Sequence, residues 1–370
     1  MIRKQVAIDT GSDELWVNPE CDDETLEPSQ RQECEGNGIY RASRSSTSDV
    51  RKVIGNATET IQYGIGRVNM TYTTDDIALP NSDIKLTSVQ FAVATNTEDL
   101  NEGILGLSFG NGTNLVYPNL VDVLFDQGVT NSKAFSVGLG NINADNSGVL
   151  IFGGVDTKKF AGELMMNEIL GPQFRGDISR YYVELNSIAL NKDGNKKTYQ
   201  NSNATVVLDT GASLSYFPTA LLMDIAQDLN GVYSKDAGLY LVDCALMGNK
   251  GTIDFAFGGG TIKIPIKDML LQERNLCALA AGADLEGARI DMLLGDSFLR
   301  SVYAVFDQTT NTIGMAPYVN CGTNEQALST KGAAGLKGEC EMPSAAGRPV
   351  ASYVSVWVGV AVGLLGLVML

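Results

Sequence analysis

The sequence predicts a mostly β protein built from two lobes of similar architecture. Short segments that alternate apolar and polar residues between turn residues indicate antiparallel strands in both halves of the 370-residue chain. An apolar run that ends in Asp-Thr-Gly occurs twice, at residues 6–11 and 206–211. A second apolar run, which contains Leu-Gly, follows each copy in the same order, at residues 104–107 and 292–295. Two motifs repeated in one order indicate an internal duplication, and the length agrees with two domains.

The composition excludes several classes of protein. A formal net charge of −16 argues against binding to nucleic acid, because a phosphate backbone needs basic patches. The chain has no histidine, which is the usual general base of serine and cysteine hydrolases and the commonest metal ligand. Carboxylates must therefore carry the protons if the protein is a hydrolase, and we expect neither a metal nor a cofactor.

The cysteines and certain asparagines predict the compartment. The six cysteines are widely spaced and include no Cys-x-x-Cys pair, which favours disulfides in an oxidising compartment over a metal cluster. Four Asn-x-Thr sequons point the same way, and we expect glycans at Asn56, Asn69, Asn111 and Asn203. We therefore expect the protein to follow the secretory pathway.

In the N-terminal half, residues 13–35 are crowded with acidic side chains. They predict either a solvated loop or a negative rim that attracts basic substrates. The alternation that follows predicts strands at residues 59–63, 67–72 and 89–93, and a further strand is expected at residues 149–154. Gly64 and Gly66 form the flexible tip of a hairpin between the first two of these strands. A helix is expected from Pro118 to Gly128, because apolar residues share one face between them.

The C-terminal half repeats this plan. A helix is expected from Pro218 to Gly231, and strand-like segments follow at residues 253–257 and 262–266. The predicted division of the chain is an N-terminal lobe at residues 1–165, a C-terminal lobe at residues 166–320, a disordered linker at residues 321–349 and a hydrophobic tail at residues 350–370.

The two ends of the chain carry signals of their own. Residues 1–5 run straight into the first Asp-Thr-Gly motif without an apolar signal segment, so we expect the natural start to lie upstream. Residues 354–370 are apolar apart from Ser355, and small residues at 344–347 precede them across a short spacer. This pattern favours a GPI-attachment signal, and the alternatives are a single membrane span or neither.

The repeated motif predicts an acid–base pair. If folding brings Asp9 and Asp209 together, the two carboxyls cannot both ionise easily, so one pKa rises and the pair shares a proton. Such a pair can take a proton from a water molecule while it donates another to a carbonyl oxygen.

The neighbours of the two aspartates support this chemistry. Thr10 and Thr210 are expected to form hydrogen bonds with the backbone of the opposite lobe and so fix the spacing. Gly11 and Gly211 allow tight turns and let a substrate backbone approach. Ser12 is expected to orient one of the carboxylates.

With these motifs the sequence resembles the pepsin-like aspartic endopeptidases, and most closely their fungal, GPI-anchored, yapsin-like branch. The resemblance is carried, in family order, by residues 5–12, 15–17, 40–47, 63–66, 103–107, 152–156, 209–211, 293–300, 305–307 and 313–316. It implies a bilobal pepsin-like acid protease fold, with a catalytic cleft between two pseudo-twofold related β lobes that holds an extended peptide.

The resemblance also implies roles for single residues. Asp9 and Asp209 would be the catalytic pair that activates the water. Tyr63, with Gly64 and Gly66 after it, would form a flap over the substrate, and Trp16 would bond to the Tyr63 hydroxyl.

The resemblance further implies two disulfides, Cys21–Cys34 and Cys244–Cys277. Cys321 and Cys340 are then left as a third pair.

Three features depart from the family. Only eight residues precede Asp9, fewer than in family members. A real start at Met1 would leave the N-terminal lobe short of its outer strands, and we expect a misplaced start instead. Ala212 stands where most members have Ser or Thr, so the second carboxylate loses a hydrogen-bond donor and its pKa should rise. We therefore expect an optimum less acidic than that of pepsin. Asn69 is a sequon close to the flap, where a glycan restricts access.

We therefore expect an aspartic endopeptidase, a hydrolase that acts at acidic pH on the fungal cell surface. Its partners would be extended peptide or protein substrates and pepstatin-like inhibitors, with no nucleic acid. We expect a monomer attached to the membrane through a C-terminal GPI anchor. The alternative is a non-catalytic surface protein that binds a peptide or polysaccharide on the same fold. The presence of both aspartates favours the enzyme.

Overall fold

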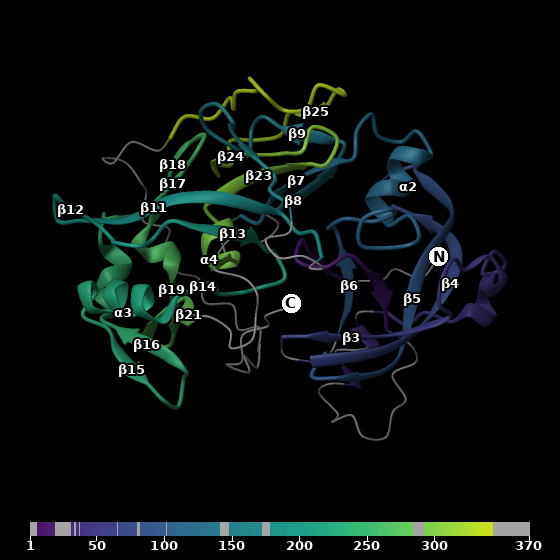
Figure 1. The fold of residues 1–370 in the computed structure, drawn as a ribbon, viewed down its shortest axis with the longest axis horizontal. Coiled ribbons are helices and arrows are strands. Elements are labelled where there is room, and N and C mark those ends of the chain that lie inside the picture. Colours follow the sequence, from purple (N-terminus) through teal and green to yellow (C-terminus); the bar gives the residue numbers. More distant parts are fainter. Residues whose placement is uncertain are drawn as a thin grey trace.

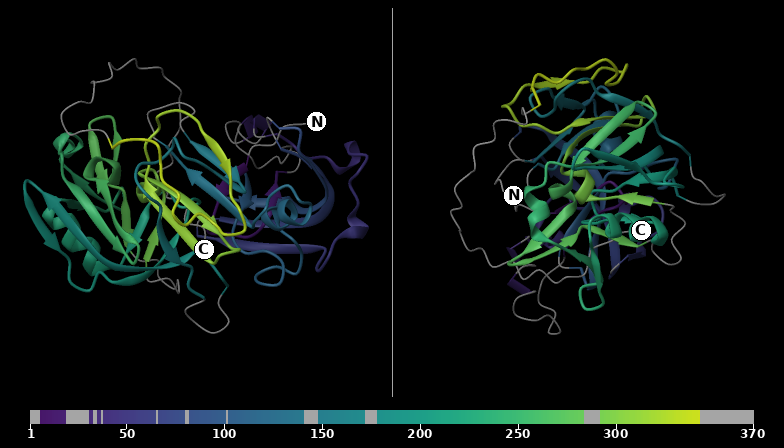
Figure 2. Two further views of the ribbon diagram at one scale, coloured as in Figure 1. Left: turned by 90° about the horizontal axis from the view of Figure 1, so that it is seen from above. Right: turned by 90° about the vertical axis from the view of Figure 1, so that its left-hand side faces the viewer.

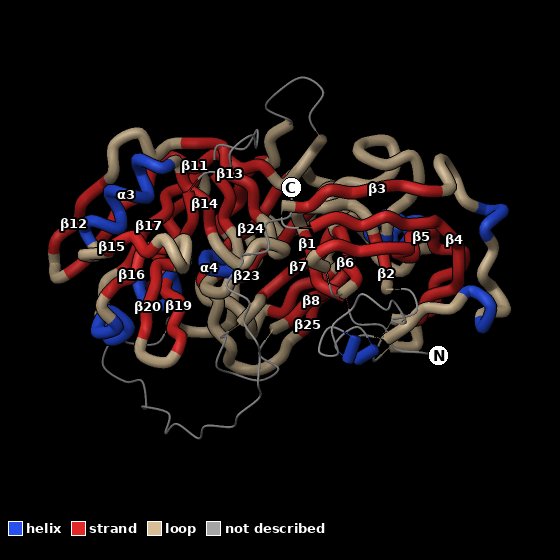
Figure 3. The backbone as a smooth tube through the Cα atoms, turned by 90° about the horizontal axis from the view of Figure 1, so that it is seen from below, coloured by secondary structure: helices blue, strands red, loops and turns tan. Residues whose placement is uncertain are grey.

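The computed structural model of the protein describes residues 6–18, 31–32, 35–36, 38–64, 66–79, 82–100, 102–140, 148–171, 178–283 and 292–342. Within these residues strands dominate, and the helices are short (Figure 3). The strand content of 48% and the helix content of 13% confirm the predicted mostly β class. The predicted Cys21–Cys34 disulfide, the start of the chain and the hydrophobic tail lie outside the described residues.

A six-stranded sheet is formed by the first part of the chain. Its strands are β1 (Val6–Asp9), β2 (Leu15–Val17), β3 (Thr58–Tyr63), β4 (Gly66–Ala78), β5 (Lys85–Glu98) and β6 (Gly103–Gly106), in the spatial order β1-β6-β2-β5-β4-β3. β1 runs parallel to β6, with Asp9 opposite Gly106, and β2 pairs antiparallel with β6. The first three strands predicted in this half fall within β3, β4 and β5.

An eight-stranded sheet repeats this core in the second part of the chain. Its strands are β11 (Tyr182–Lys192), β12 (Asn195–Thr198), β13 (Ala204–Leu208), β14 (Ser215–Phe217), β17 (Thr252–Phe257), β18 (Gly260–Pro265), β21 (Ala281–Ala283) and β22 (Met292–Leu294). Their order is β18-β17-β11-β13-β22-β14-β21, and β12 pairs with β11. β13 runs parallel to β22, which pairs antiparallel with β14. The three strands β13-β22-β14 therefore reproduce β1-β6-β2, as an internal duplication predicts.

A five-stranded sheet joins the two halves. Its strands are β7 (Ala134–Gly138), β8 (Val149–Phe152), β10 (Met165–Glu168), β23 (Val302–Asp307) and β24 (Thr312–Pro317), in the order β10-β24-β23-β7-β8. In Figure 1 it lies between the N-terminal strands on the right and the C-terminal strands on the left. Phe135 of β7 stacks on Phe306 of β23, with ring centroids 5.0 Å apart. The hydrophobic core is therefore continuous from one half to the other.

The remaining elements surround these sheets. A four-stranded sheet has the order β15-β16-β20-β19 and consists of β15 (Val232–Ser234), β16 (Leu239–Val242), β19 (Leu270–Glu273) and β20 (Leu276–Leu279). The helices are α2 (Leu120–Asp126), α3 (Thr219–Asp228) and α4 (Asp296–Leu299), with 3-10 turns η1 (Ala42–Arg44), η2 (Val50–Lys52), η3 (Cys244–Gly248) and η4 (Ile266–Met269). Cys244 and Cys277 form a disulfide, as the resemblance implied. No helix among the described residues is long and apolar enough to cross a membrane.

The two longer helices begin in different ways. α2 begins after Asn119, because the Asn119 side chain accepts a hydrogen bond from the Asp122 N–H and the Asp122 side chain accepts one from the Asn119 N–H. The helix therefore starts two residues after the predicted Pro118. α3 starts directly after Pro218, as predicted, and buries Leu221 and Ile225.

The segment after residue 320 is folded where a linker was expected. β25 (Glu325–Ala327) pairs antiparallel with β9 (Gly154–Asp156), and Cys321 forms a disulfide with Cys340. Leu328 is buried in the core beside β9. In Figure 1 the segment is yellow and lies along β9, and Figure 2 gives two further views. The predicted disordered linker is therefore wrong for residues 321–342, because strand pairing and a disulfide hold a stretch whose small residues indicated flexibility.

Candidate active site

Asp9 and Asp209 occupy equivalent positions in the two sheets. Asp9 is the last residue of β1, and Asp209 directly follows β13. Each of these strands runs parallel to the strand of a Leu-Gly run, which is β6 in one sheet and β22 in the other. Both side chains are buried, with exposed fractions of 0% and 1%.

Two threonines lock the aspartate loops together. The Thr10 hydroxyl donates to the Leu208 carbonyl at 2.8 Å, and the Thr210 hydroxyl donates to the Ile8 carbonyl at 2.7 Å. Each hydroxyl also accepts the backbone N–H of the other threonine, at 3.1 Å and 3.0 Å. These four bonds cross between segments about 200 residues apart in sequence and so fix the separation of the two loops.

The two glycines bring the carboxyls close. A Cβ atom on Gly11 would lie 2.5 Å from Cγ of Asp209, and one on Gly211 would lie 2.5 Å from Oδ1 of Asp9. Any side chain at either position would therefore collide with the opposite carboxyl. Each glycine N–H also donates to Oδ1 of its own aspartate, at 2.7 Å for Gly11 and 2.8 Å for Gly211.

The other oxygens of the two carboxyls have different surroundings. The Ser12 hydroxyl donates to Oδ2 of Asp9. Oδ2 of Asp209 is buried and has no hydrogen-bond partner among the described residues. Ala212 occupies the position that corresponds to Ser12, and its buried methyl group donates nothing.

This difference affects the protonation of the pair. Burial raises the pKa of Asp9, while the hydrogen bond from Ser12 opposes the rise. Burial raises the pKa of Asp209 well above its ordinary value, and the charge of Asp9 raises it further, while the Gly211 N–H opposes the rise. The pair therefore shares a proton that Asp209 holds more tightly.

Arg180 is a charged neighbour of the pair that no sequence motif indicates. Tyr182 lies opposite Val207 in the antiparallel pair of β11 and β13, and this register carries Arg180 toward Asp209. Arg180 is only 7% exposed, and its Nη1 atom has no hydrogen-bond partner among the described residues. Its positive charge opposes the rise in the pKa of Asp9 and of Asp209.

Two further acids flank the pair, one beside each loop. Asp13 follows Ser12 and accepts a hydrogen bond from Asn114 at 2.8 Å, and burial raises its pKa to about 6. The Asp296 N–H donates to the Ala212 carbonyl at 2.7 Å, and burial raises the pKa of the Asp296 side chain to about 7. Asp13 is buried, so neither the solvated loop nor the negative rim predicted for residues 13–35 describes it. Within the described part of the chain, no group of three or more Cys, Asp or Glu side chains could hold a metal ion.

The hairpin of β3 and β4 carries the predicted flap residues. Tyr63 lies opposite Gly66 at the end of the hairpin, and Gly64 beside it is exposed. The Trp16 Nε1–H donates to the Tyr63 hydroxyl at 2.9 Å, and both side chains are buried. This bond joins β2, which follows the first aspartate loop, to the tip of the hairpin.

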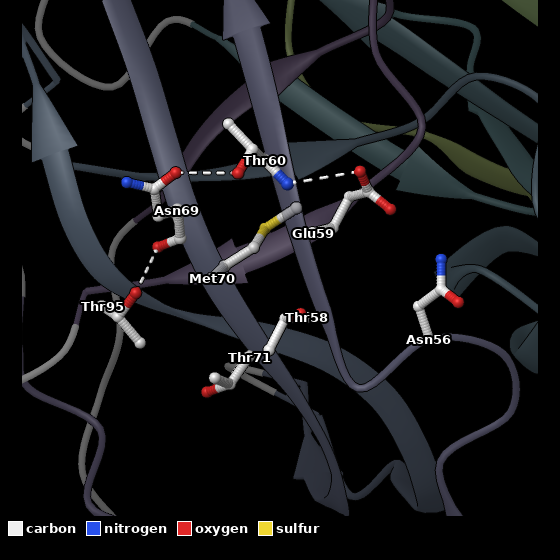
Figure 4. A pocket seen from close by; sticks show the side chains of 8 residues that line it. All are labelled: Asn56, Thr58, Glu59, Thr60, Asn69, Met70, Thr71 and Thr95. Atoms are coloured by element: carbon white, nitrogen blue, oxygen red, sulfur yellow. Dashed lines mark hydrogen bonds between the residues drawn. The ribbon is translucent and has the colours of Figure 1, made fainter.

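Two of the four sequons, Asn69 on β4 and Asn56 just before β3, line a pocket of about 490 Å³ (Figure 4). The lining residues are Asn56, Thr58, Glu59, Thr60, Asn69, Met70, Thr71 and Thr95. The Thr60 hydroxyl donates to Oδ1 of Asn69 at 2.8 Å. Asn56, Asn111 and Asn203 are exposed, and Asn69 is half-buried. The pocket lies apart from the aspartates, neither of which lines it.

Comparison with known proteins agrees with this geometry. The family described as eukaryotic aspartyl protease matches residues 3–318. The chain is 31% identical to the probable aspartic-type endopeptidase opsB of Aspergillus fumigatus, over 97% of this chain and 74% of the relative. It is 33% identical to secreted aspartic protease 8 of Candida albicans, over 85% of this chain and 72% of the relative.

Proposed function

Because the chain belongs to the eukaryotic aspartyl protease family, we propose that it hydrolyses peptide bonds with a water molecule held between Asp9 and Asp209. Membership of this pepsin-like family makes the protein an aspartic endopeptidase, a hydrolase with peptide substrates and pepstatin-type inhibitors. The roles of the two aspartates rest on one observation, which is that the glycine of each Asp-Thr-Gly lies against the carboxyl of the other.

The two carboxyls take different parts in the proposed reaction. The Ser12 hydroxyl stabilises the charge of Asp9, which accepts a proton from the water. At the same time the water oxygen attacks the peptide carbonyl carbon. Asp209 holds the shared proton and donates it to the carbonyl oxygen, which gives a neutral tetrahedral intermediate. The intermediate collapses when Asp9 passes its proton to the leaving nitrogen and Asp209 takes back the proton of the hydroxyl group.

The hairpin of β3 and β4 acts as the flap in this proposal. Tyr63, Gly64 and Gly66 lie over the bound peptide, and Trp16 holds the Tyr63 side chain in place. The half-buried Asn69 lies six residues after Tyr63 in the same hairpin, and a glycan there narrows the approach to the flap.

We further propose that the enzyme is secreted, monomeric and attached to the cell surface, as in the yapsin-like branch. The disulfides and a relative named as a secreted aspartic protease support the secretory route. The apolar residues 354–370, preceded by small residues, support a GPI anchor. In this proposal the lobes cover residues 1–165 and 166–320.

Cleavage of a long peptide by the processed full-length chain tests the catalytic proposal. The assay covers about pH 3 to 6, where one carboxyl of such a pair is ionised, with and without pepstatin. We expect cleavage that pepstatin abolishes. Absence of cleavage over this range would refute the catalytic role and favour a non-catalytic binding protein on the same fold.

The proposed anchor is tested separately. A phosphatidylinositol-specific phospholipase should release the protein from intact cells if a GPI anchor holds it. Retention of the protein on treated cells would contradict the anchor and favour a membrane span.

A further inference from the structure

Glu14 is a buried carboxyl that the proposed reaction does not use. It lies between β1 and β2, two residues after Ser12 and two before Trp16, and is 8% exposed. A buried charge is costly unless donors replace the lost water. Burial raises the pKa of Glu14, and hydrogen bonds from two tyrosines oppose the rise.

The two tyrosines come from separate segments. The Tyr72 hydroxyl donates to Oε1 of Glu14 at 2.9 Å, and the Tyr117 hydroxyl donates to Oε2. Tyr72 belongs to β4 of the hairpin, whereas Tyr117 precedes α2. The rings meet edge to face, with centroids 5.6 Å apart. The carboxyl therefore joins the hairpin and the segment before α2 through a single side chain.

The backbone of Glu14 is fixed to the strand that pairs with β1. The Gly106 N–H donates to the Glu14 carbonyl at 2.9 Å. A Cβ atom on Gly106 would lie 2.5 Å from the Glu14 nitrogen, so the two backbones pack directly together. Gly106 is also the partner of Asp9 in the parallel pair of β1 and β6. The position of Glu14 is therefore tied to that of Asp9.

The hairpin is thus joined to the segment after Asp9 at two points. Trp16 holds Tyr63 at the end of β3, and Glu14 holds Tyr72 in the middle of β4. The backbone already holds the hairpin, because β4 pairs with β5 along its length and β5 pairs with β2. The two side-chain bonds add a link from the segment after Asp9 to each strand of the hairpin. An apolar residue at position 14 would fill the same space without making the second bond.

We propose that Glu14 is a positioning residue that sets the place of the β3–β4 hairpin relative to Asp9, and thereby the affinity of the site for a peptide. The proposal rests on the proposed function, in which this hairpin is the flap. It assigns no contact between Glu14 and the substrate.

Two matched variants separate this role from simple packing. Tyr72→Phe and Tyr117→Phe each remove one hydroxyl donor to Glu14 and keep the buried ring. Only Tyr72 lies on the hairpin. We expect a similar loss of melting temperature for both variants. We expect Tyr72→Phe to raise KM and the pepstatin inhibition constant about fivefold, and Tyr117→Phe to change both less than about twofold, with kcat little changed.

Two substitutions of Glu14 complete the test. Glu14→Ala loses both bonds, and we expect KM and the pepstatin constant to rise about tenfold. Glu14→Gln keeps both bonds, because its amide oxygen accepts from one hydroxyl and its NH₂ donates to the other. We therefore expect Glu14→Gln to restore values within about threefold of the parent chain.

Hydrogen exchange of the full chain gives a readout that does not depend on activity. Faster exchange of the backbone amides at residues 58–78 in Tyr72→Phe, but not in Tyr117→Phe, supports the proposal. Equal effects of the two variants on exchange, or on KM, overturn it and leave Glu14 with a packing role. An inactive parent chain would refute the proposed function, and the exchange comparison would still decide the role of Glu14.

Discussion

The two Asp-Thr-Gly loops have matching backbones and different side-chain surroundings. In both loops the threonine hydroxyl donates across to the other lobe, at 2.8 Å and 2.7 Å, and the glycine touches the opposite carboxyl. Only in the first loop does a hydroxyl, that of Ser12, reach the carboxyl. The second loop has Ala212 there, and Oδ2 of Asp209 has no partner among the described residues.

This comparison separates two properties of a duplicated site. The strands and threonines determine where the carboxyls lie, and they are the same in both copies. The proton affinity of each carboxyl depends on single donors and charges, which differ between the copies. One substitution can therefore change the chemistry of a copy without changing its position.

Removal of either carboxyl should have the largest effect. We expect Asp9→Asn and Asp209→Asn each to lower kcat at least about 10³-fold, because the pair acts as a unit. Peptide cleavage measures the loss, and circular dichroism checks that each variant is folded. If one variant kept a tenth of the parent rate, the two copies would not both be needed.

The flanking acids should make stability depend on pH. Asp13 and Asp296 have pKa values of about 6 and about 7 in the folded chain, against 3.8 for an ordinary aspartate. The folded state therefore binds more protons than the unfolded state between these values, and stability falls as the pH rises from 3.8 toward about 7. The Asp13→Asn variant cannot lose a proton at this position. At the upper end of this pH range its free energy of unfolding should therefore be about 3 kcal/mol higher than that of the parent chain, at 1.36 kcal/mol per pKa unit.

Urea unfolding at both ends of this range measures the effect. Asp296→Asn should recover at least as much stability as Asp13→Asn, because its pKa is raised further. A chain whose unfolding midpoint rises with pH over this interval would contradict the assignment.

Substitution of Thr10 and of Thr210 tests whether the two loops contribute equally to the contact between them. Thr10→Val and Thr210→Val each remove a hydroxyl that donates to one backbone group and accepts from another, so both partners lose their bonds. We expect each variant to lower the free energy of unfolding by about 2 to 4 kcal/mol. Chemical denaturation should give similar values for the two, and a large difference would show that one loop carries more of the contact.

The positive charge of Arg180 acts on the aspartates of both Asp-Thr-Gly loops, and a substitution of Arg180 tests this effect. Arg180→Leu removes a cation that lowers the pKa of both aspartates, so the pKa values should rise. One carboxyl must be ionised for activity, so the acidic limb of the profile of kcat/KM against pH should shift to higher pH by about one unit. Lys192→Gln, at the far end of β11, is the matched control and should leave the limb in place. An unmoved limb in Arg180→Leu would show that its charge does not reach the pair.

The smallest effect is expected where the copies differ by one hydroxyl. Ala212→Ser gives Asp209 the donor that Asp9 already has, so the pKa of Asp209 should fall. We expect the optimum to move down by about half a pH unit. Ser12→Ala should raise the pKa of Asp9. If the profile of Ala212→Ser matched that of the parent, Ala212 would not be the cause of the asymmetry.

The sequence predicted the features that short motifs encode. The repeated Asp-Thr-Gly runs, their Leu-Gly partners and the hairpin strands lie where their patterns indicated, because apolar runs and turn residues act locally. The start of α2 was displaced by two residues, since Asn119 rather than Pro118 provides the cap. Membership of the family rests on the same motifs.

Features that depend on distant partners were not predicted. Glu14 was placed in an acidic loop, because its tyrosine partners are 58 and 103 residues away in sequence. Arg180 lies near Asp209 because of the register of β11 against β13, and the sequence alone does not specify that register. The segment after residue 320 has the composition of a linker, and its order comes from pairing with β9 and from a disulfide.

That segment also determines how the body of the protein bears a mechanical load. Tension applied to the chain beyond residue 342 first meets Cys340, whose disulfide passes it to Cys321. β25 lies within the loop that this disulfide closes, so tension passes through the disulfide and bypasses the pairing of β25 with β9. The force then reaches the fold next to β24, which belongs to the sheet shared by both halves. This point is far in sequence from the two aspartates. Tension at the C-terminal end of the described residues therefore meets the Cys321–Cys340 disulfide before it meets the strands that carry the two aspartates.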